Sequence, residues 1–233
     1  MRLIQLVVAV APALILMKKV YSLDKIEKEP AGLLWKLFLF GCLSVIPGAI
    51  LELLYTRFVA PLFLTASQTI YLLANNFLGV ALIEEGCKFF FLYKKAYRHP
   101  AFNYRFDGVV YAVFVSLGFA LVENVLYVLK FGLSAALMRA LLSVPLHAVC
   151  GVYMGLSFGE LKSRSSQKSL LPAALFCLPL PILIHGFYDY CLSRDNGQSL
   201  LLFFVFVAAV FLLCFKRLKT ASRKDAPIDP PIS

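Results

Sequence analysis

The chain has 233 residues, of which 61% are hydrophobic and only 15% are charged, and its mean hydropathy is +0.80. Soluble globular domains average about 45–50% apolar and about 25% charged residues, so the composition excludes that class and indicates an integral membrane protein. The net charge of +10 does not require a nucleic-acid partner, because the basic residues follow the alternating pattern of a membrane protein's connections.

The apolar residues fall into separate blocks of about 20 residues, the length that a helix needs to cross a hydrocarbon core of about 30 Å. The weaker alternating segments of a porin-type barrel are absent. The sequence therefore predicts an all-α polytopic membrane protein with about seven transmembrane helices. In chain order the seven blocks are 2–17, 34–55, 69–93, 107–129, 133–157, 170–192 and 199–216.

The blocks form one predicted transmembrane domain over 1–217, and the Pro- and Asp-containing residues 218–233 are expected to be a disordered cytoplasmic tail. The first block is expected to be a retained helix, because Lys18 and Lys19 follow its apolar run, whereas a signal peptide has its positive charge in front. Residues 56–68, interrupted by Pro61, are expected to form a loop.

The connections 18–32, 94–105 and 158–169, together with the residues after Leu213, hold 16 of the 23 Lys and Arg residues, whereas the alternate connections hold four. By the positive-inside rule this asymmetry predicts an N-terminus outside and a C-terminus in the cytoplasm. The basic side also faces anionic lipid, so the bilayer is the partner that the charge implies.

A charged side chain at the centre of a membrane helix costs roughly 3 kcal/mol on insertion scales, so such residues are paired, face a cavity or serve a function. Four consecutive blocks carry nearly all of the acids and histidines of this kind. The polar residues within these blocks are Glu84, Glu85, Lys88, Asp107, Glu123, Asn124, Arg139, His147, His185 and Asp189.

Helix geometry assigns different expectations to the three charges of the third block. Glu84 and Lys88 are four residues apart and share a face, so an ion pair is expected between them. Glu85 differs from Glu84 by about 100° around the helix. It is therefore expected to point into a central site. Glu52, near the outer end of the second block, is expected to form a structural pair with Arg57.

The histidines have both structural and functional interpretations. His185 and Asp189 are four residues apart, so the carboxylate can set the imidazole tautomer or simply form a hydrogen bond near the outer interface. His147 follows Pro145, which is expected to bend its helix, and a membrane histidine often serves packing alone. Glu123 has no cationic partner within one turn.

If the helices are straight, these side chains are expected at different distances from the cytoplasmic edge of the membrane. At about 1.5 Å per residue, Glu84 and His147 are expected about 14–15 Å from the cytoplasmic edge, and His185 and Glu123 about 22–25 Å from it. Glu123 is then expected to support the site from its outer side, unless tilt closes the gap.

The cysteines show no CxxC or other metal-binding spacing and are expected to be packing residues. They are Cys42, Cys87, Cys150, Cys177, Cys191 and Cys214.

The joint pattern resembles the PrsW family of intramembrane proteases over about residues 75–192. The run from Glu84 to Lys88 matches EExxK and the run from Phe119 to Asn124 matches FxxxEN. His147 and the run from His185 to Asp189 match the later histidine motifs. The preceding Phe106-Asp107-Gly108 also looks like the family's DG motif.

The resemblance implies a bacterial, multi-pass cell-membrane protein that hydrolyses a peptide bond in a single-span membrane protein. Such proteases, distantly related to CAAX prenyl endopeptidases, make the first cut in a membrane-bound anti-sigma factor and release a stress response. The catalytic set that the motifs imply is Glu84, Glu85, Glu123, His147 and His185.

The residue types are compatible with two forms of water attack. The preferred form needs no cofactor. In it, Glu84 or Glu85 takes a proton from the attacking water, and Asn124 and a histidine donate hydrogen bonds to the oxyanion that forms on the carbonyl. In the second form, His147, His185 and Glu123 hold a zinc ion, although an HExxH spacing is absent. Lys88 and Asp189 support the site in either form.

Two other classes of function use the same residues. A proton- or ion-coupled transporter would place acids and histidines along a relay, but the internal repeats common in transporters are not detected. A non-catalytic membrane scaffold would keep the fold without the chemistry. The ordered motifs favour the protease.

Overall fold

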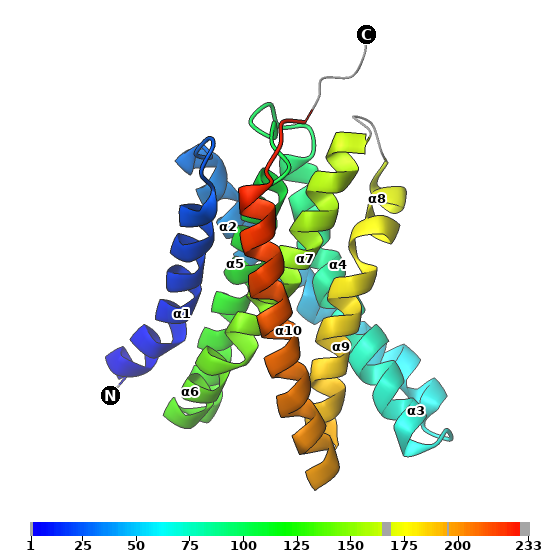
Figure 1. The fold of residues 1–233 in the computed structure, drawn as a ribbon. Helices are drawn as coiled ribbons and strands as arrows, with labels where there is room; N and C mark the ends of the chain where they lie inside the picture. Colours follow the sequence, from blue (N-terminus) through cyan, green and yellow to red (C-terminus); the bar gives the residue numbers. More distant parts are fainter. Residues whose placement is uncertain (1, 165–168, 195, 229–233) are drawn as a thin grey trace.

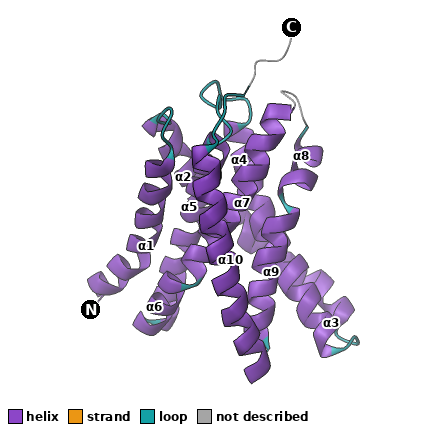
Figure 2. Cartoon of the chain, in the orientation of Figure 1, coloured by secondary structure: helices purple, strands orange, loops and turns teal. Residues whose placement is uncertain are grey.

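The protein is a bundle of long helices (Figure 1). The computed structural model describes residues 2–164, 169–194 and 196–228, and within these ranges it contains no β-strand (Figure 2). The longer helices are α1 (Arg2–Leu23), α2 (Ala31–Leu54), α4 (Leu82–Ala96), α5 (Asp107–Phe131), α7 (Ser143–Arg164), α9 (Pro179–Ser193) and α10 (Gly197–Arg223). The shorter segments are η1 (Tyr55–Val59), η2 (Ala60–Phe63), α3 (Gln68–Leu73), η3 (Ala74–Ala81), α6 (Leu133–Leu141) and α8 (Leu170–Cys177).

The predicted all-α membrane fold is confirmed, with fewer clear spans than expected. In the described part of the chain, five helical runs are long and apolar enough to cross a membrane, and a sixth is added if α8 and α9 form one bent span. The predicted block 69–93 is helical throughout as α3, η3 and α4. It is not among the five, and it carries Glu84, Glu85 and Lys88.

The segment 56–68 is mostly helical, so the expectation of a loop there was wrong. The π-helical η1 continues α2 without a break, and the 3₁₀ segment η2 extends the helical path to Phe63. Pro61 lies in the first turn of η2, where the missing N–H of proline removes no helical hydrogen bond. The connection is therefore reduced to 64–67, where Ser67 caps α3 by accepting a hydrogen bond from Ile70 N at 3.4 Å.

The fifth and sixth predicted blocks are each broken. Leu142, with φ −121° and ψ −60°, separates α6 from α7. Pro145 lies in the first turn of α7, where proline is tolerated, so the break precedes the proline and the bend was not placed correctly. In the sixth block, α8 and α9 differ in direction by 51°, and Pro179 is the first residue of α9.

Glycines allow α5 to pack closely against helices on two sides. A Cβ added at Gly108 would lie 2.7 Å from the Gly155 carbonyl oxygen of α7. A Cβ added at Gly118 would lie 3.0 Å from the backbone nitrogen of Cys42 in α2. Small residues are typical of membrane helix interfaces because they let backbones approach. α5 is thereby held between two neighbours, and this packing sets the position of Glu123.

The cysteines are unpaired, and all except the partly exposed Cys42 are buried. The Cys150 thiol lies 3.7 Å from the Pro181 carbonyl oxygen, linking α7 to α9. Their positions agree with the expected packing role.

The N-terminal end of α1 and the C-terminal end of α10 lie at opposite ends of the bundle (Figure 1). The α1–α2 and α4–α5 connections and the end of α7 lie at the same end as the C-terminus (Figure 1). The segments rich in Lys and Arg therefore gather at one end of the molecule.

Part of the expected disordered tail is ordered. α10 continues to Arg223, and the residues after it dock on the α4–α5 connection: Ile228 N donates to Asn103 O at 2.7 Å and Arg105 N donates to Ala226 O at 3.0 Å. These backbone bonds supply partners that a free tail would take from water. The order extends to residue 228, and 229–233 lie outside the described residues.

Candidate active site

The third charged block folds so that its lysine binds both acids. η3 leads directly into α4, whose first turn contains Glu84 and Glu85. Lys88, one turn later, places its Nζ 3.1 Å from Glu84 Oε2 and 2.8 Å from Glu85 Oε1. The expected Glu84–Lys88 pair is confirmed, but Glu85 is not free of the lysine as expected. The flexible lysine side chain reaches positions three and four residues back equally well.

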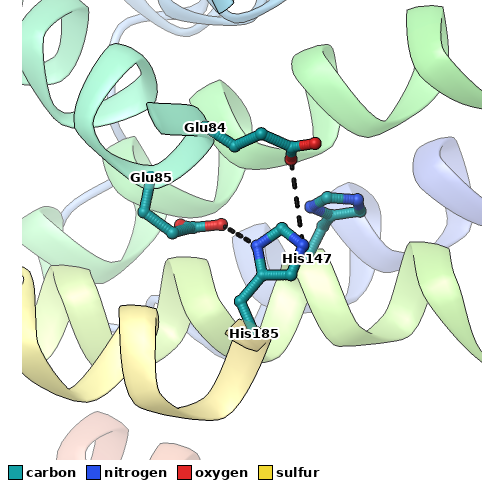
Figure 3. A group of neighbouring side chains, drawn as sticks. All are labelled: Glu84, Glu85, His147 and His185. Atoms are coloured by element: carbon teal, nitrogen blue, oxygen red, sulfur yellow. Dashed lines mark hydrogen bonds and ion pairs between the residues drawn. The ribbon is translucent and has the colours of Figure 1, made fainter. Parts of the chain in front are cut away.

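His185 of α9 lies between the two carboxylates of α4 (Figure 3). Its Nδ1 is 2.8 Å from Glu85 Oε1 and its Nε2 is 3.9 Å from Glu84 Oε2. Asp189, one turn further along α9, lies 3.3 Å from the same Nε2. The predicted contact between His185 and Asp189 is present, and it orients a ring that also faces the acids of α4.

His147 of α7 connects Lys88 to Glu123. Its Nδ1 is 3.0 Å from Lys88 Nζ, and its Nε2 is 3.0 Å from Glu123 Oε2. An ammonium group can only donate, so Nδ1 accepts and Nε2 carries the hydrogen that is donated to Glu123. Lys88 thus directs its three hydrogens to Glu84, Glu85 and His147, and it sets the tautomer of the histidine.

Arg139 is a cationic partner of Glu123 that the sequence did not reveal. Its Nη2 is 2.9 Å from Glu123 Oε2, and its Nε donates to Asn124 Oδ1 at 3.3 Å. Arg139 lies in α6, 16 residues beyond Glu123, so no helical spacing could pair them. The turn at Gly132, with φ +82°, sets α6 beside α5 and brings the two together.

Asn124 does not face the histidines. Its Nδ2 donates to the Ala9 carbonyl oxygen of α1 at 2.7 Å, and it is fully buried. Adjacent helix residues point about 100° apart, so Glu123 faces the site while Asn124 faces α1. The geometry therefore gives Asn124 a structural contact in place of the expected contact with an oxyanion.

A cavity of about 630 Å³ opens onto these groups. Glu85 contacts His185 as expected, but it is Glu84 and not Glu85 that lines the cavity. Glu52 also lines the cavity, and among the described residues no ion pair joins it to Arg57, so the expected Glu52–Arg57 pair is wrong. The charged and histidine side chains of the lining are Glu52, Glu84, Glu123, Arg139, His147, His185 and Asp189.

The expected difference in depth is absent, because Glu123 and His147 are in direct contact. That difference assumed seven straight spans with predicted ends. The 51° bend between α8 and α9 and the wide turns of η3 change the paths of these helices. The histidine and acid motifs therefore meet at one level.

The site contains a set of donors that suits a metal ion. One ligand atom from each of four side chains, Glu84, Glu85, His147 and His185, lies within 4.8 Å of the others. Imidazole nitrogens and carboxylate oxygens are ligands that zinc takes in catalytic sites. Glu85 Oε2 is buried and has no hydrogen-bond partner. The residues therefore fit a zinc ion, with Glu84 and Glu85 supplying the carboxylates in place of the expected Glu123.

The chain is similar to known proteins over most of its length. The family model described as PrsW family intramembrane metalloprotease matches residues 29–214, a wider range than the 75–192 expected from the motifs. Protease PrsW of Shouchella clausii (strain KSM-K16) is 36% identical over 218 residues, which are 92% of this chain and 95% of that protein. Protease PrsW of Geobacillus kaustophilus (strain HTA426) is 36% identical over 225 residues, covering 96% and 95%.

Protease PrsW of Bacillus subtilis (strain 168) is 32% identical over 206 residues, covering 88% of this chain and 89% of that protein. No solved structure shows significant similarity to the chain. The family match, the relatives and the buried cluster of acids and histidines lead to the same conclusion. The chain belongs to the PrsW family of intramembrane metalloproteases and is a multi-pass membrane hydrolase acting on peptide bonds.

Proposed function

We propose that Glu84 is the general base that activates the attacking water. The observation that carries this assignment is that Glu84 lines the cavity while Glu85 is fully buried behind it. Both acids bind Lys88, so one buried positive charge holds the pair in place. Glu85 then acts as a positioning residue, because its Oε1 contacts His185 at 2.8 Å.

In the proposed reaction a water bound in the cavity loses a proton to the Glu84 carboxylate as its oxygen bonds to the scissile carbonyl carbon. The carbonyl oxygen becomes an oxyanion. When the C–N bond breaks, Glu84 passes the proton to the departing amine nitrogen, as a carboxylate that serves first as base and then as acid does. The products are a carboxylate and an amine, and Glu84 is regenerated.

Arg139 and His185 supply positive charge and hydrogen bonds near the reacting carbonyl. Both line the cavity, and the Glu123 carboxylate holds the Arg139 guanidinium at 2.9 Å. Donors fixed in advance stabilise an oxyanion without reorganisation, and this electrostatic contribution is commonly the largest in acyl transfer. We assign the oxyanion to this side of the cavity, in place of Asn124.

Three of the four possible donors, His147, His185 and the Glu85 carboxylate, would hold a zinc ion and leave the Glu84 carboxylate free as the base. When bound, zinc lowers the pKa of a coordinated water to about 7 and polarises a carbonyl. With Nε2–H of His147 donated to Glu123, its Nδ1 would be the donor to the ion, which requires that Lys88 no longer donates to that nitrogen, while Asp189 keeps the orientation of His185. This support is typical of the carboxylate contacts that orient metal-ligating histidines.

The proposed substrate is a single-span protein of the bacterial cell membrane, such as an anti-sigma factor. The cavity is formed by membrane helices, so a substrate anchored in the same bilayer reaches it by lateral diffusion. We further propose seven spans with the N-terminus outside and the C-terminus in the cytoplasm. The opposite placement of the two ends supports an odd number of crossings (Figure 1), and the basic connections support the orientation.

The test is co-expression of the full chain with tagged single-span proteins, including anti-sigma factors, followed by detection of cleaved fragments. Glu84→Gln keeps the side-chain size and removes the base, and we expect cleavage to fall by about 10²–10⁴-fold, the usual contribution of general acid–base catalysis. Glu160→Gln makes the same chemical change at a surface ion pair with Arg105 and Arg164 and should cleave normally. Undiminished cleavage by Glu84→Gln would rule out its role as base.

A further inference from the structure

A second group of carboxylates lies at the end of the bundle where α1 ends and α5 begins. Asp24 and Glu29 belong to the α1–α2 connection, and Asp107 is the first residue of α5. One oxygen from each of these three side chains lies within 4.8 Å of the others. Glu123 of the active site follows Asp107 by about 24 Å along α5 at about 1.5 Å per residue. The group is therefore separate from the catalytic cavity.

All three side chains are removed from solvent. Asp24 and Asp107 are each 1% exposed, and Glu29 is 4% exposed. Asp24 Oδ2 and Asp107 Oδ1 are buried and have no hydrogen-bond partner. Buried polar atoms without a protein partner are rare in native proteins, and a bound ion is one of the explanations for them.

The remaining oxygens are held in place by the protein. Asp107 Oδ2 accepts hydrogen bonds from the backbone nitrogens of Asn103 at 3.0 Å and Tyr104 at 2.7 Å. The Tyr111 hydroxyl of α5 donates to Glu29 Oε2. These bonds hold the Asp107 and Glu29 carboxylates in place, with one oxygen of each of the three side chains within 4.8 Å of the others.

One positive side chain, Lys28, acts on Asp24 through its charge but forms no ion pair with it. Lys28 directs its ammonium to the carbonyl oxygens of Tyr21, at 2.7 Å, and of Asp24, and not to a carboxylate. Among the residues that the structure describes, neither Asp24, Glu29 nor Asp107 takes part in an ion pair.

Carboxylates this close together repel one another when they are charged. The Asp225 carboxylate, which follows α10, adds further negative charge near Asp24. Buried charges of one sign are normally paired, protonated or bound to metals.

We propose that Asp24, Glu29 and Asp107 form a second metal site, which takes a hard divalent cation of the Ca²⁺ or Mg²⁺ class. The donors are all oxygen atoms, the ligand type that these cations prefer, whereas the active site offers imidazole nitrogens. The cation ties the α1–α2 connection to the first turn of α5. It thereby fixes the start of the helix that carries Glu123.

The test uses terbium, which takes the place of Ca²⁺ at oxygen sites and luminesces when a nearby aromatic ring is excited. Purified full-length protein in a neutral maltoside detergent is stripped of metal and titrated with Tb³⁺. We expect saturable luminescence that Ca²⁺ displaces, because Tyr111 is bonded to a ligand of the site. Tyr111→Phe should lower the luminescence, and Asp24→Asn or Asp107→Asn should weaken Tb³⁺ binding by at least tenfold.

Two matched controls separate this site from the rest of the molecule. Glu27→Gln changes an acid of the same connection that bonds to Asn103 instead, and Glu84→Gln changes the active site; both should keep the luminescence. The proposal is overturned if the wild-type chain shows no saturable Tb³⁺ binding. It is also overturned if Asp24→Asn, Glu29→Gln and Asp107→Asn all bind Tb³⁺ as the wild type does. Either result would show that protons alone neutralise the group. The thermal unfolding midpoint of each variant shows whether it is folded. Displacement of Tb³⁺ by Ca²⁺ is measured on the wild-type chain, so it tests the site even if a variant does not fold.

Discussion

Lys88 shows how much of the site a local spacing reveals. The pair with Glu84 follows from a four-residue separation on one helix and is confirmed at 3.1 Å. The bonds to Glu85 and to His147 depend on the rotamer of the lysine and on a histidine 59 residues further along the chain. The residue types of the site were predicted from the sequence, while the partners across helices were not.

Arg139 was missed as a site residue for the same reason. It lies inside an apolar block as Glu123 does, and the presence of two opposite charges at membrane depth is the signal that could have paired them. The three-residue and four-residue rules of a single helix do not extend across the loop at Gly132, whose φ of +82° turns the chain from α5 into α6.

Arg139→Lys tests the proposed oxyanion contact. Lysine keeps the charge but cannot bond to Glu123 and Asn124 together, since it lacks the fork of the guanidinium. We expect kcat to fall by about 10²–10³-fold, as on loss of one oxyanion donor, with a smaller change in KM, measured on a purified single-span substrate. Arg57→Lys, at an exposed position of η1, serves as the control, and an equal loss in both variants would contradict the assignment.

At the scale of elements, helix existence was predicted better than helix continuity. Apolar length finds every long helix, because any chain segment in a bilayer must satisfy its backbone hydrogen bonds internally. It does not find the break at Leu142 or the 51° bend before Pro179. These depend on how α6 and α9 pack against their neighbours, and they decide which side chains meet in the cavity.

Gly155→Ala tests the packing of α5 on α7. A Cβ at Gly155 would lie 2.8 Å from the Gly108 carbonyl carbon, and neither backbone can move without shifting a helix. We expect a loss of about 1–3 kcal/mol in stability, the usual effect of overpacking. In detergent this should appear as a thermal unfolding midpoint lower by several degrees.

Gly86→Ala is the matched control, because an added Cβ there meets nothing within 4 Å. A glycine in a helix interior is less stable than alanine by about 0.5–1 kcal/mol, so this variant should be unchanged or slightly more stable. Equal destabilisation of both variants would mean that the α5–α7 contact is not the cause.

At the scale of the whole molecule, the nitrogen and oxygen donors of the cavity come from three separate helices, α4, α7 and α9. We expect chelation of zinc in the purified protein to abolish cleavage and added zinc to restore it, since the four donors suit that ion. Cleavage of substrate peptides before chelation, after it and after zinc addition measures this. Full activity in metal-free protein would show that Glu84 activates the water without a zinc ion.

The orientation of the bundle is also testable. Single cysteines placed near the N-terminus and after α10, in a background without the six native cysteines, are labelled with a membrane-impermeant maleimide on intact cells. The positive-inside rule predicts labelling of the N-terminal cysteine alone. Labelling of both or of neither would mean an even number of crossings.

The membrane class, the long helices and nearly every polar residue of the site were determined by the sequence alone. Burial in a bilayer selects apolar blocks of fixed length and makes each internal charge conspicuous. Only the tertiary structure decided which of Glu84 and Glu85 lines the cavity, which cation pairs with Glu123, and that Asp24, Glu29 and Asp107 meet. Those contacts join residues distant in the chain, and they arise from glycine packing and helix breaks that no local periodicity records.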